Sequence, residues 1–168
     1  MQVRKSILGT PADSMSDSDI IAAIGARSVA ICAGPTIPLY TGRIDATDAD
    51  PSGRLPDENA PASELKANFA RQGFSVREFV CLCGAHTLGS KGFGDPATFD
   101  NAYFIALLRK PWLDRFDPMA DMIGLNSDHV LPEDPECEEW IKLYAKDQSQ
   151  FHADFVKAYT KITTLGYA

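Results

Sequence analysis

An apolar, helix-like stretch that ends in a histidine constrains this chain more than any other feature of its sequence. The stretch Phe79–Cys83 contains no charged residue, and His86 follows it after two small residues, Gly84 and Ala85. Gly89 is a third small residue on the other side. Such neighbours would let a large flat group approach closely, and a neutral imidazole with one free ring nitrogen is a good metal ligand. The alternative is a core histidine whose ring nitrogens are satisfied by the backbone.

Six segments with distinctive patterns follow one another along the chain. Two are loops with glycine, proline and arginine, one contains the histidine, and three lie after it. In order they are Ala33–Pro38 with Thr41–Asp45 (AGPTIP and TGRID), Gly53–Asp57 (GRLPD), Phe74–Gly89, Phe99–Phe104 (FDNAYF), Leu125–Asp128 (LNSD), and Tyr144–Asp147 with Phe151 and Phe155.

In this order, over about residues 16–168, the segments resemble the plant-type haem peroxidases, and more closely the class I ascorbate and cytochrome c peroxidases. The resemblance implies a mainly α-helical fold, the proximal helical domain of a haem peroxidase with long irregular loops. We expect residues 1–15 to form an N-terminal extension and residues 16–168 to form the peroxidase-like domain. The resemblance also implies that His86 is the axial ligand of a haem iron.

Three other residues receive roles through the resemblance. Asp128 matches the buried aspartate that holds the other ring nitrogen of the axial histidine, which fixes the tautomer and makes the ligand more electron-donating. Without that match, Asp128 would be interpreted as a turn residue. Thr87 and Asp100 match positions of a cation site near the haem in some members, and oxygen ligands suit a hard cation. Two residues do not make a site, however, and Asp100 could equally be a charge at a helix N-terminus.

The peroxide-cleaving residues of the family are missing from the expected place. By resemblance, an arginine, an aromatic residue and a histidine lie on an early helix, before the loop that corresponds to Gly34–Pro35. The segment before this loop contains Arg4 and Arg27 but no histidine, and His129 and His152 come much later. Peroxide cleavage needs a base to move a proton and a cation to stabilise the leaving oxygen. We therefore expect no catalytic residues, and a chain that corresponds to the proximal half alone.

The stretch after the axial motif also departs from the family. It is shorter than usual, and the tryptophan beside the axial histidine in the closest relatives has no equivalent, since Phe93 and Pro96 occupy this region. The position of a haem-propionate contact in some relatives, six residues after His86, is Gly92. A haem bound to this chain alone would have its distal face open to water, so the sequence leaves haem binding open.

The composition is that of an ordinary globular domain, with 45% hydrophobic and 23% charged residues among 168. The net charge is −7 at pH 7 and no run of lysine or arginine occurs, so we expect no nucleic-acid partner. No apolar stretch approaches the length of a membrane span, and we expect no transmembrane segment. Residues 1–6 are basic but lack the hydrophobic stretch of a secretory signal.

Capping residues and hydrophobic spacing predict several helices and a long irregular loop over residues 34–60. The predicted helices cover about residues 17–33, 61–72, 75–86, 97–109, 135–145 and 149–164, and a short β pair within residues 90–130 is an alternative for that region. On the last helix, an apolar stripe of Phe151, Phe155, Tyr159 and Ile162 predicts a core face.

Two functions from different classes fit these observations. We favour a peroxidase-derived, non-catalytic protein that acts as a structural or accessory subunit of a larger assembly. A protein partner would then cover the face left by the missing distal half, because large apolar patches usually demand a partner. By analogy with non-catalytic relatives at the thylakoid membrane, the assembly could be a chloroplast photosystem. The alternative is a haem peroxidase that reduces hydrogen peroxide, with distal residues supplied by another chain or by an unrecognised group.

Overall fold

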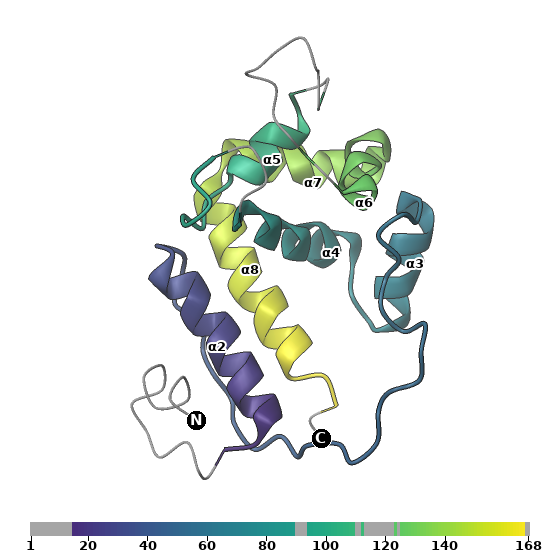
Figure 1. The fold of residues 1–168 in the computed structure, drawn as a ribbon. Coiled ribbons are helices and arrows are strands. Elements are labelled where there is room, and N and C mark those ends of the chain that lie inside the picture. The colour runs from purple at the N-terminus through teal and green to yellow at the C-terminus, as the bar shows by residue number, and fades with distance from the viewer. Residues whose placement is uncertain (1–14, 90–93, 110–111, 113–122, 124, 167–168) are drawn as a thin grey trace.

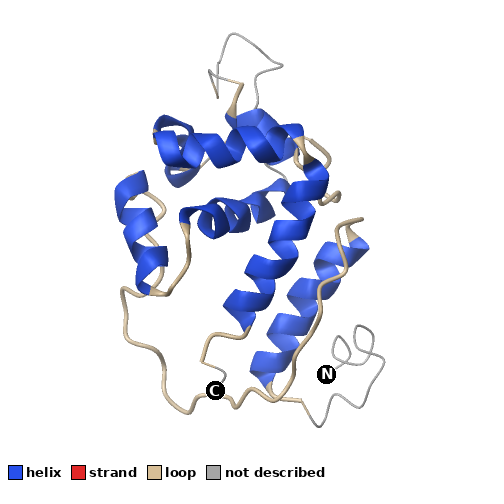
Figure 2. Cartoon of the chain, turned by 180° about the vertical axis from the view of Figure 1, so that it is seen from behind, coloured by secondary structure: helices blue, strands red, loops and turns tan. Residues whose placement is uncertain are grey.

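The structure is a computed structural model that describes residues 15–89, 94–109, 112, 123 and 125–166 (Figure 1). These residues contain helices and no strand (Figure 2), which confirms the mainly α-helical fold. The elements are α2 (Asp17–Ile31), α3 (Ala62–Arg71), α4 (Val76–Cys83), η2 (Gly84–Thr87), α5 (Ala102–Leu107), α6 (Asn126–His129), η3 (Leu131–Glu133), α7 (Pro135–Lys146) and α8 (Gln148–Thr163). The β pair considered for residues 90–130 is absent from the described part of that range.

Most helices begin where their capping residues predict. The hydroxyl of Ser16 accepts a hydrogen bond from an amide in the first turn of α2, and the carboxylates of Asp134 and Asp147 do the same for α7 and α8. Ser75 and Glu78 form both hydrogen bonds of a capping box at the start of α4. A side-chain oxygen in this position satisfies amides that have no partner within the helix.

The predicted helix over residues 97–109 is wrong in its extent, because α5 covers only Ala102–Leu107. The backbone amide of Phe99 donates to the carbonyl of Cys32 at 2.6 Å, and the side chain of Asp95 accepts hydrogen bonds within a turn just before it. An amide that bonds to a distant carbonyl cannot also donate within a helix. The contact with the end of α2 therefore delays the start of α5.

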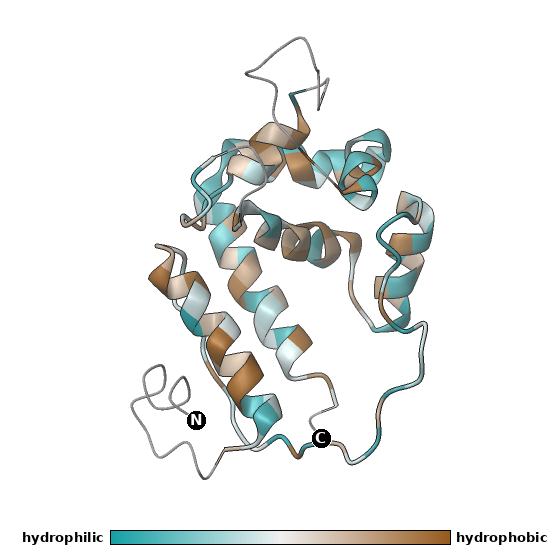
Figure 3. Ribbon diagram, viewed as in Figure 1, coloured by the Kyte–Doolittle hydropathy of each residue, from teal (hydrophilic) through white to brown (hydrophobic). Residues whose placement is uncertain are grey.

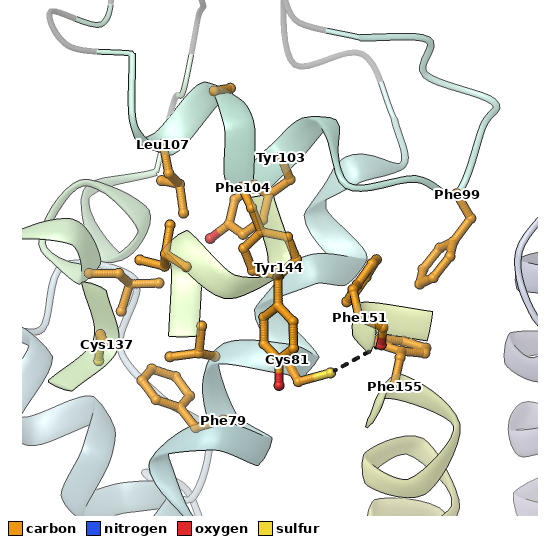
Figure 4. Close-up of a cluster of buried hydrophobic side chains, with 14 of the residues drawn as sticks. Phe79, Cys81, Phe99, Tyr103, Phe104, Leu107, Cys137, Tyr144, Phe151 and Phe155 are labelled. Carbon is orange, nitrogen blue, oxygen red and sulfur yellow. Dashed lines mark hydrogen bonds between the residues drawn. The ribbon is translucent and has the colours of Figure 1, made fainter. Parts of the chain in front are cut away.

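An aromatic core lies where α4, α5, α7 and α8 meet (Figure 4). The rings of Phe104, Tyr144 and Phe151 lie within 6 Å of one another, and all three side chains are fully buried. Phe155 on α8 is buried as the apolar stripe predicts, whereas Ile162 near the end of this helix is 38% exposed. Because α4 contacts both α7 and α8, this core fixes the end of the helix that leads to His86.

Helix α2 lies beside α8 in both views (Figures 1 and 2). The hydroxyl of Tyr159 donates to the carbonyl of Ala22 at 3.0 Å, and a Cβ at Gly25 would meet the same hydroxyl at 2.0 Å, so only glycine permits this approach. Parts of α2 are hydrophobic (Figure 3), and two of its isoleucines, Ile21 and Ile31, are 72% and 68% exposed on a helix that also exposes Arg27.

The segment between α2 and α3 is an irregular loop, as predicted, and it is tied to α2 by charged residues. Asp45 accepts from the first two amides of α2, at 2.8 Å each. Arg43 pairs with the buried Asp19 at 2.7 Å and also donates to the carbonyl of Thr163 at the end of α8. Among the described residues, none of the helices combines the length and the apolar character that crossing a membrane requires.

Candidate haem-binding site

His86 lies in a 3-10 turn that extends the C-terminus of α4. The capping box starts α4 at Val76, and the helix ends at Cys83, where η2 (Gly84–Thr87) continues it. The sequence predicts this position near a helix end, and the structure confirms it. The imidazole is about one third exposed, so it remains accessible from one side.

Asp128 meets the imidazole of His86 from α6. The Nδ1 atom of His86 lies 2.9 Å from Oδ1 and 3.1 Å from Oδ2 of Asp128, whose side chain is 3% exposed. An ionised carboxylate only accepts hydrogen bonds, so Nδ1 carries the proton. In the neutral ring the lone pair is then on Nε2, which has no hydrogen-bond partner among the described residues. This is the arrangement in which an imidazole is ready to bind a metal.

Tyr103 is a third member of this group, and the sequence alone assigns it no role at the site. Its hydroxyl donates to Oδ1 of Asp128 at 2.6 Å, and its ring meets the ring of His86 edge to face, with centroids 5.7 Å apart. Burial, and then the negative charge of Asp128, raise the pKa of Tyr103 well above its usual value. The phenol therefore stays protonated and acts as a donor. The sequence feature that could have pointed to this role is the tyrosine of the FDNAYF segment.

A cavity of about 400 Å³ borders the pair, with both His86 and Asp128 in its wall. The rest of the lining is mostly apolar and includes Leu55, Pro56, Leu65, Phe69, Phe79 and Leu82. The GRLPD loop reaches this wall because the carbonyl of Glu58 accepts from the amide of Ser127 at 2.9 Å, next to Asp128. Cys83 also lines the cavity, and burial raises the pKa of its thiol, so this side chain is a neutral group.

These residues fit the group that the family implies. An apolar wall suits the flat hydrophobic ring of a haem, and the free nitrogen of a carboxylate-bound histidine suits its iron. His86 would hold the iron, and Asp128 would hold the imidazole. The role of His86 as an axial ligand stays a prediction.

One of the three small residues beside His86 serves a different purpose from the one expected. A Cβ at Gly84 would lie 2.5 Å from the ring of Phe151 and 2.8 Å from that of Phe104, so this glycine lets the aromatic core approach the backbone. Only Ala85 and Gly89 are exposed. The interpretation that all three make room for a flat group is therefore wrong for Gly84.

Thr87 and Asp100 lie together, but the structure shows them bonded to each other. The hydroxyl of Thr87 donates to Asp100 at 2.8 Å, and the same carboxylate oxygen accepts from the amide of Ala102 in the first turn of α5. This agrees with the helix N-terminal role considered for Asp100. The described residues contain no cluster of three or more histidine, cysteine or acidic side chains that could hold a metal. The cation site stays a prediction.

The remaining residues of interest lie elsewhere. The ring nitrogens of His129 and His152 meet the backbone carbonyls of Ile123 and Phe99, and Arg27 is exposed on α2. The carbonyl of Pro96 accepts from the amide of Gly89 at 2.9 Å, which closes the segment after His86. Arg4, Gly92 and Phe93, which the sequence analysis singled out, lie outside the described residues.

Comparison with known proteins identifies the family of this chain. A family model described as peroxidase matches residues 3–147. The chain is 52% identical over 152 residues to "Putative L-ascorbate peroxidase 6" of Arabidopsis thaliana. This alignment covers 90% of this chain and 46% of that protein. The chain is 34% identical over 155 residues to "Putative cytochrome c peroxidase, mitochondrial" of Yarrowia lipolytica, covering 79% of the chain and 54% of that protein.

A third relative, "Putative heme-binding peroxidase" of Pyricularia oryzae, is 35% identical over 176 residues, covering 89% of the chain and 59% of that protein. The chain belongs to the peroxidase family, and within it to the plant-type class I group, as the sequence predicts. It spans about half the length of the relatives it matches.

Proposed function

We propose that this chain is the proximal, haem-binding half of a class I peroxidase. The observation that carries the proposal is the His86–Asp128 hydrogen bond of 2.9 Å in the wall of an apolar cavity. When bound, a haem supplies a redox-active iron. His86 binds it through Nε2, while Asp128 holds the proton on Nδ1 and makes the imidazole a stronger donor. The apolar side chains of the cavity wall keep water from this face.

Reduction of hydrogen peroxide also needs groups on the other face of the haem. Among the described residues, His129 and His152 each have one ring nitrogen bonded to a backbone carbonyl, and neither lines the cavity beside His86. We propose that the base and the cation come from a further segment or chain, and that the residues described here do not turn over peroxide without it.

A non-catalytic, structural subunit is the second candidate, and the exposed Ile21 and Ile31 of α2 favour it. Exposed large apolar side chains can contribute to a contact with a protein partner. Association with a photosystem rests on analogy and stays a prediction. Three relatives have names that state a location, which is peroxisomal for two of them and mitochondrial for the third.

The proposal is tested by adding haem to the purified chain and recording the Soret absorption. We expect the chain to give a stoichiometric Soret band of a histidine-ligated haem, and His86→Ala to lose it. His152→Ala is the matched control, because His152 is also a half-buried histidine with one hydrogen bond, and it should keep the band. Equal Soret bands from both variants would show that His86 is not the ligand.

A further inference from the structure

We propose that Tyr103 is a positioning residue of the candidate site: its hydroxyl shares the Asp128 carboxylate with His86 and so limits how strongly Asp128 polarises the imidazole. The inference concerns the apo chain as well as the haem complex. It rests on the proposed function only where it describes bound haem.

The two donors converge on one oxygen atom. Oδ1 of Asp128 accepts from the hydroxyl of Tyr103 at 2.6 Å and from Nδ1 of His86 at 2.9 Å. A distance of 2.6 Å is typical of a strong hydrogen bond between a hydroxyl and an ionised carboxylate. Because the Asp128 side chain is 3% exposed, water screens its charge little. A stronger hydrogen bond from one donor therefore weakens the hydrogen bond that the carboxylate accepts from the other donor.

The surrounding core keeps Tyr103 in this position. Its side chain is fully buried, and its ring packs edge to face on Phe104, with centroids 5.1 Å apart. Helix α5, which carries Tyr103, contacts both η2 and α7. The hydroxyl therefore cannot leave Asp128 for solvent without disturbing the core, so the competition with His86 is permanent.

Removing the hydroxyl should strengthen the remaining hydrogen bond. With Tyr103→Phe the negative charge of Asp128 acts on the Nδ1–H of His86 alone, and the imidazole becomes more anionic in character. A more anionic imidazole is a stronger ligand for an oxidised iron. The expected direction is thus a stronger His86–Asp128 bond, and in a haem complex a lower reduction potential.

A second buried tyrosine–aspartate pair provides the matched control. The hydroxyl of Tyr144 donates to Asp154 at 3.0 Å, and Tyr144 is also fully buried in the aromatic core. Asp154 further binds Arg77 and has no hydrogen bond to His86. Tyr144→Phe therefore removes a comparable buried hydroxyl without touching the carboxylate of Asp128.

The first experiment uses the apo chain labelled with ¹⁵N-histidine and measures the NMR shift of the His86 Nδ1–H proton. We expect Tyr103→Phe to move this proton downfield, while Tyr144→Phe leaves it in place. The signals of His129 and His152 serve as internal references. A fluorotyrosine at position 103, which is a more acidic phenol and a stronger donor, should move the His86 proton upfield. If Tyr103→Phe does not fold, the fluorotyrosine variant still tests whether the hydroxyl at position 103 affects the His86–Asp128 hydrogen bond. If neither substitution at position 103 changes the NMR shift of the His86 Nδ1–H proton, the inference is wrong.

The second experiment uses the haem complex. We expect Tyr103→Phe to raise the iron–histidine stretching frequency in resonance Raman spectra. We also expect it to disfavour reduction of the iron by about tenfold, which is about 59 mV for a one-electron couple. Tyr144→Phe should change neither quantity. If neither the native chain nor any variant gives a Soret band, the proposed function is wrong. The NMR experiment on the apo chain still tests whether Tyr103 affects His86. If haem binds and Tyr103→Phe behaves like Tyr144→Phe, the inference alone is wrong.

Discussion

At the scale of single residues, the site depends on one buried carboxylate. Asp128 accepts from both His86 and Tyr103, and all three side chains come from different elements, α6, η2 and α5. A buried charge is tolerated only when it is paired or hydrogen-bonded, so these contacts support the fold as well as the site. The described residues leave no fully buried side-chain nitrogen or oxygen without a partner.

We predict that Asp128→Ala lowers the free energy of unfolding by about 1–3 kcal/mol, because it removes the acceptor of two donors, one of them the fully buried Tyr103. Urea unfolding monitored by circular dichroism measures the change. Asp50→Ala is the control, because Asp50 is 82% exposed and its ion pair with Arg54 should contribute little. Equal stabilities for the two variants would show that the Asp128 contacts do not support the fold.

At the scale of elements, close packing of α4 and η2 on α8 decides where His86 lies. Gly84 begins η2 and faces the rings of Phe104 and Phe151. Interiors this dense tolerate little added volume. The loop after α2 is held in a different way: the Asp19 carboxylate of α2 accepts from the loop amide of Gly42, and the side chain of Arg43 in the loop donates to the carbonyl of Thr163 in α8.

We predict that Gly84→Ala destabilises the chain by about 1–3 kcal/mol, because its Cβ would overlap the ring of Phe151 at 2.5 Å. Thermal unfolding of this variant, of Phe151→Leu and of the double variant forms a double-mutant cycle. If the clash is the cause, Phe151→Leu should cost less in the Gly84→Ala background than in the native chain. Strictly additive losses would contradict this account.

Stability should fall in acid partly through Asp19. Burial acts to raise the pKa of Asp19, but hydrogen bonds from the amides of Gly42 and Arg43 and from the Arg43 guanidinium outweigh it, so the pKa is lowered on balance. A carboxylate with a lowered pKa in the folded state stabilises the fold above its unfolded pKa and loses this contribution as pH falls through the folded pKa.

We therefore predict that Asp19→Asn destabilises the chain at pH 7 and flattens the loss of stability below about pH 4, where aspartates of the unfolded chain take up protons. Urea unfolding at several pH values measures both effects. An Asp19→Asn variant whose stability falls with acid as steeply as that of the native chain would show that other carboxylates dominate.

At the scale of the whole molecule, the described helices bring His86 and Asp128 to the wall of a mostly apolar cavity and leave Ile21 and Ile31 of α2 exposed. The chain spans about half the length of its relatives, and we propose that a further segment or chain supplies the distal base. The partner expected to cover the missing half and the division into residues 1–15 and 16–168 stay predictions.

We predict that the haem-loaded chain alone reduces hydrogen peroxide far more slowly than a complete peroxidase, because general acid–base catalysis is worth about 10²–10⁴-fold. Addition of the unmatched segment of the Arabidopsis relative, as a separate polypeptide, should raise steady-state peroxide turnover. Ile21→Ser with Ile31→Ser should weaken this rescue if α2 is the contact face. Fast turnover by the chain alone, lost in His86→Ala, would show that it contains its own distal group.

The sequence by itself was sufficient for the features that depend on neighbours along the chain. The starts of α4 and α7 follow from Ser75, Glu78 and Asp134, because a cap bonds to amides only two or three residues away. His86 was identified by its apolar approach and its small neighbours. Its pairing with Asp128, 42 residues further on, came only through the resemblance to peroxidases.

Only the tertiary structure decided the features that depend on contacts across the fold. The late start of α5 comes from the hydrogen bond between the amide of Phe99 and the carbonyl of Cys32. The hydroxyl of Tyr103 donates to Asp128, which lies 25 residues further along the chain. The small size of Gly84 beside His86 suggests that it makes room for a flat group, yet it faces Phe151. Helical spacing states which residues share a face, but packing alone determines which partner that face meets.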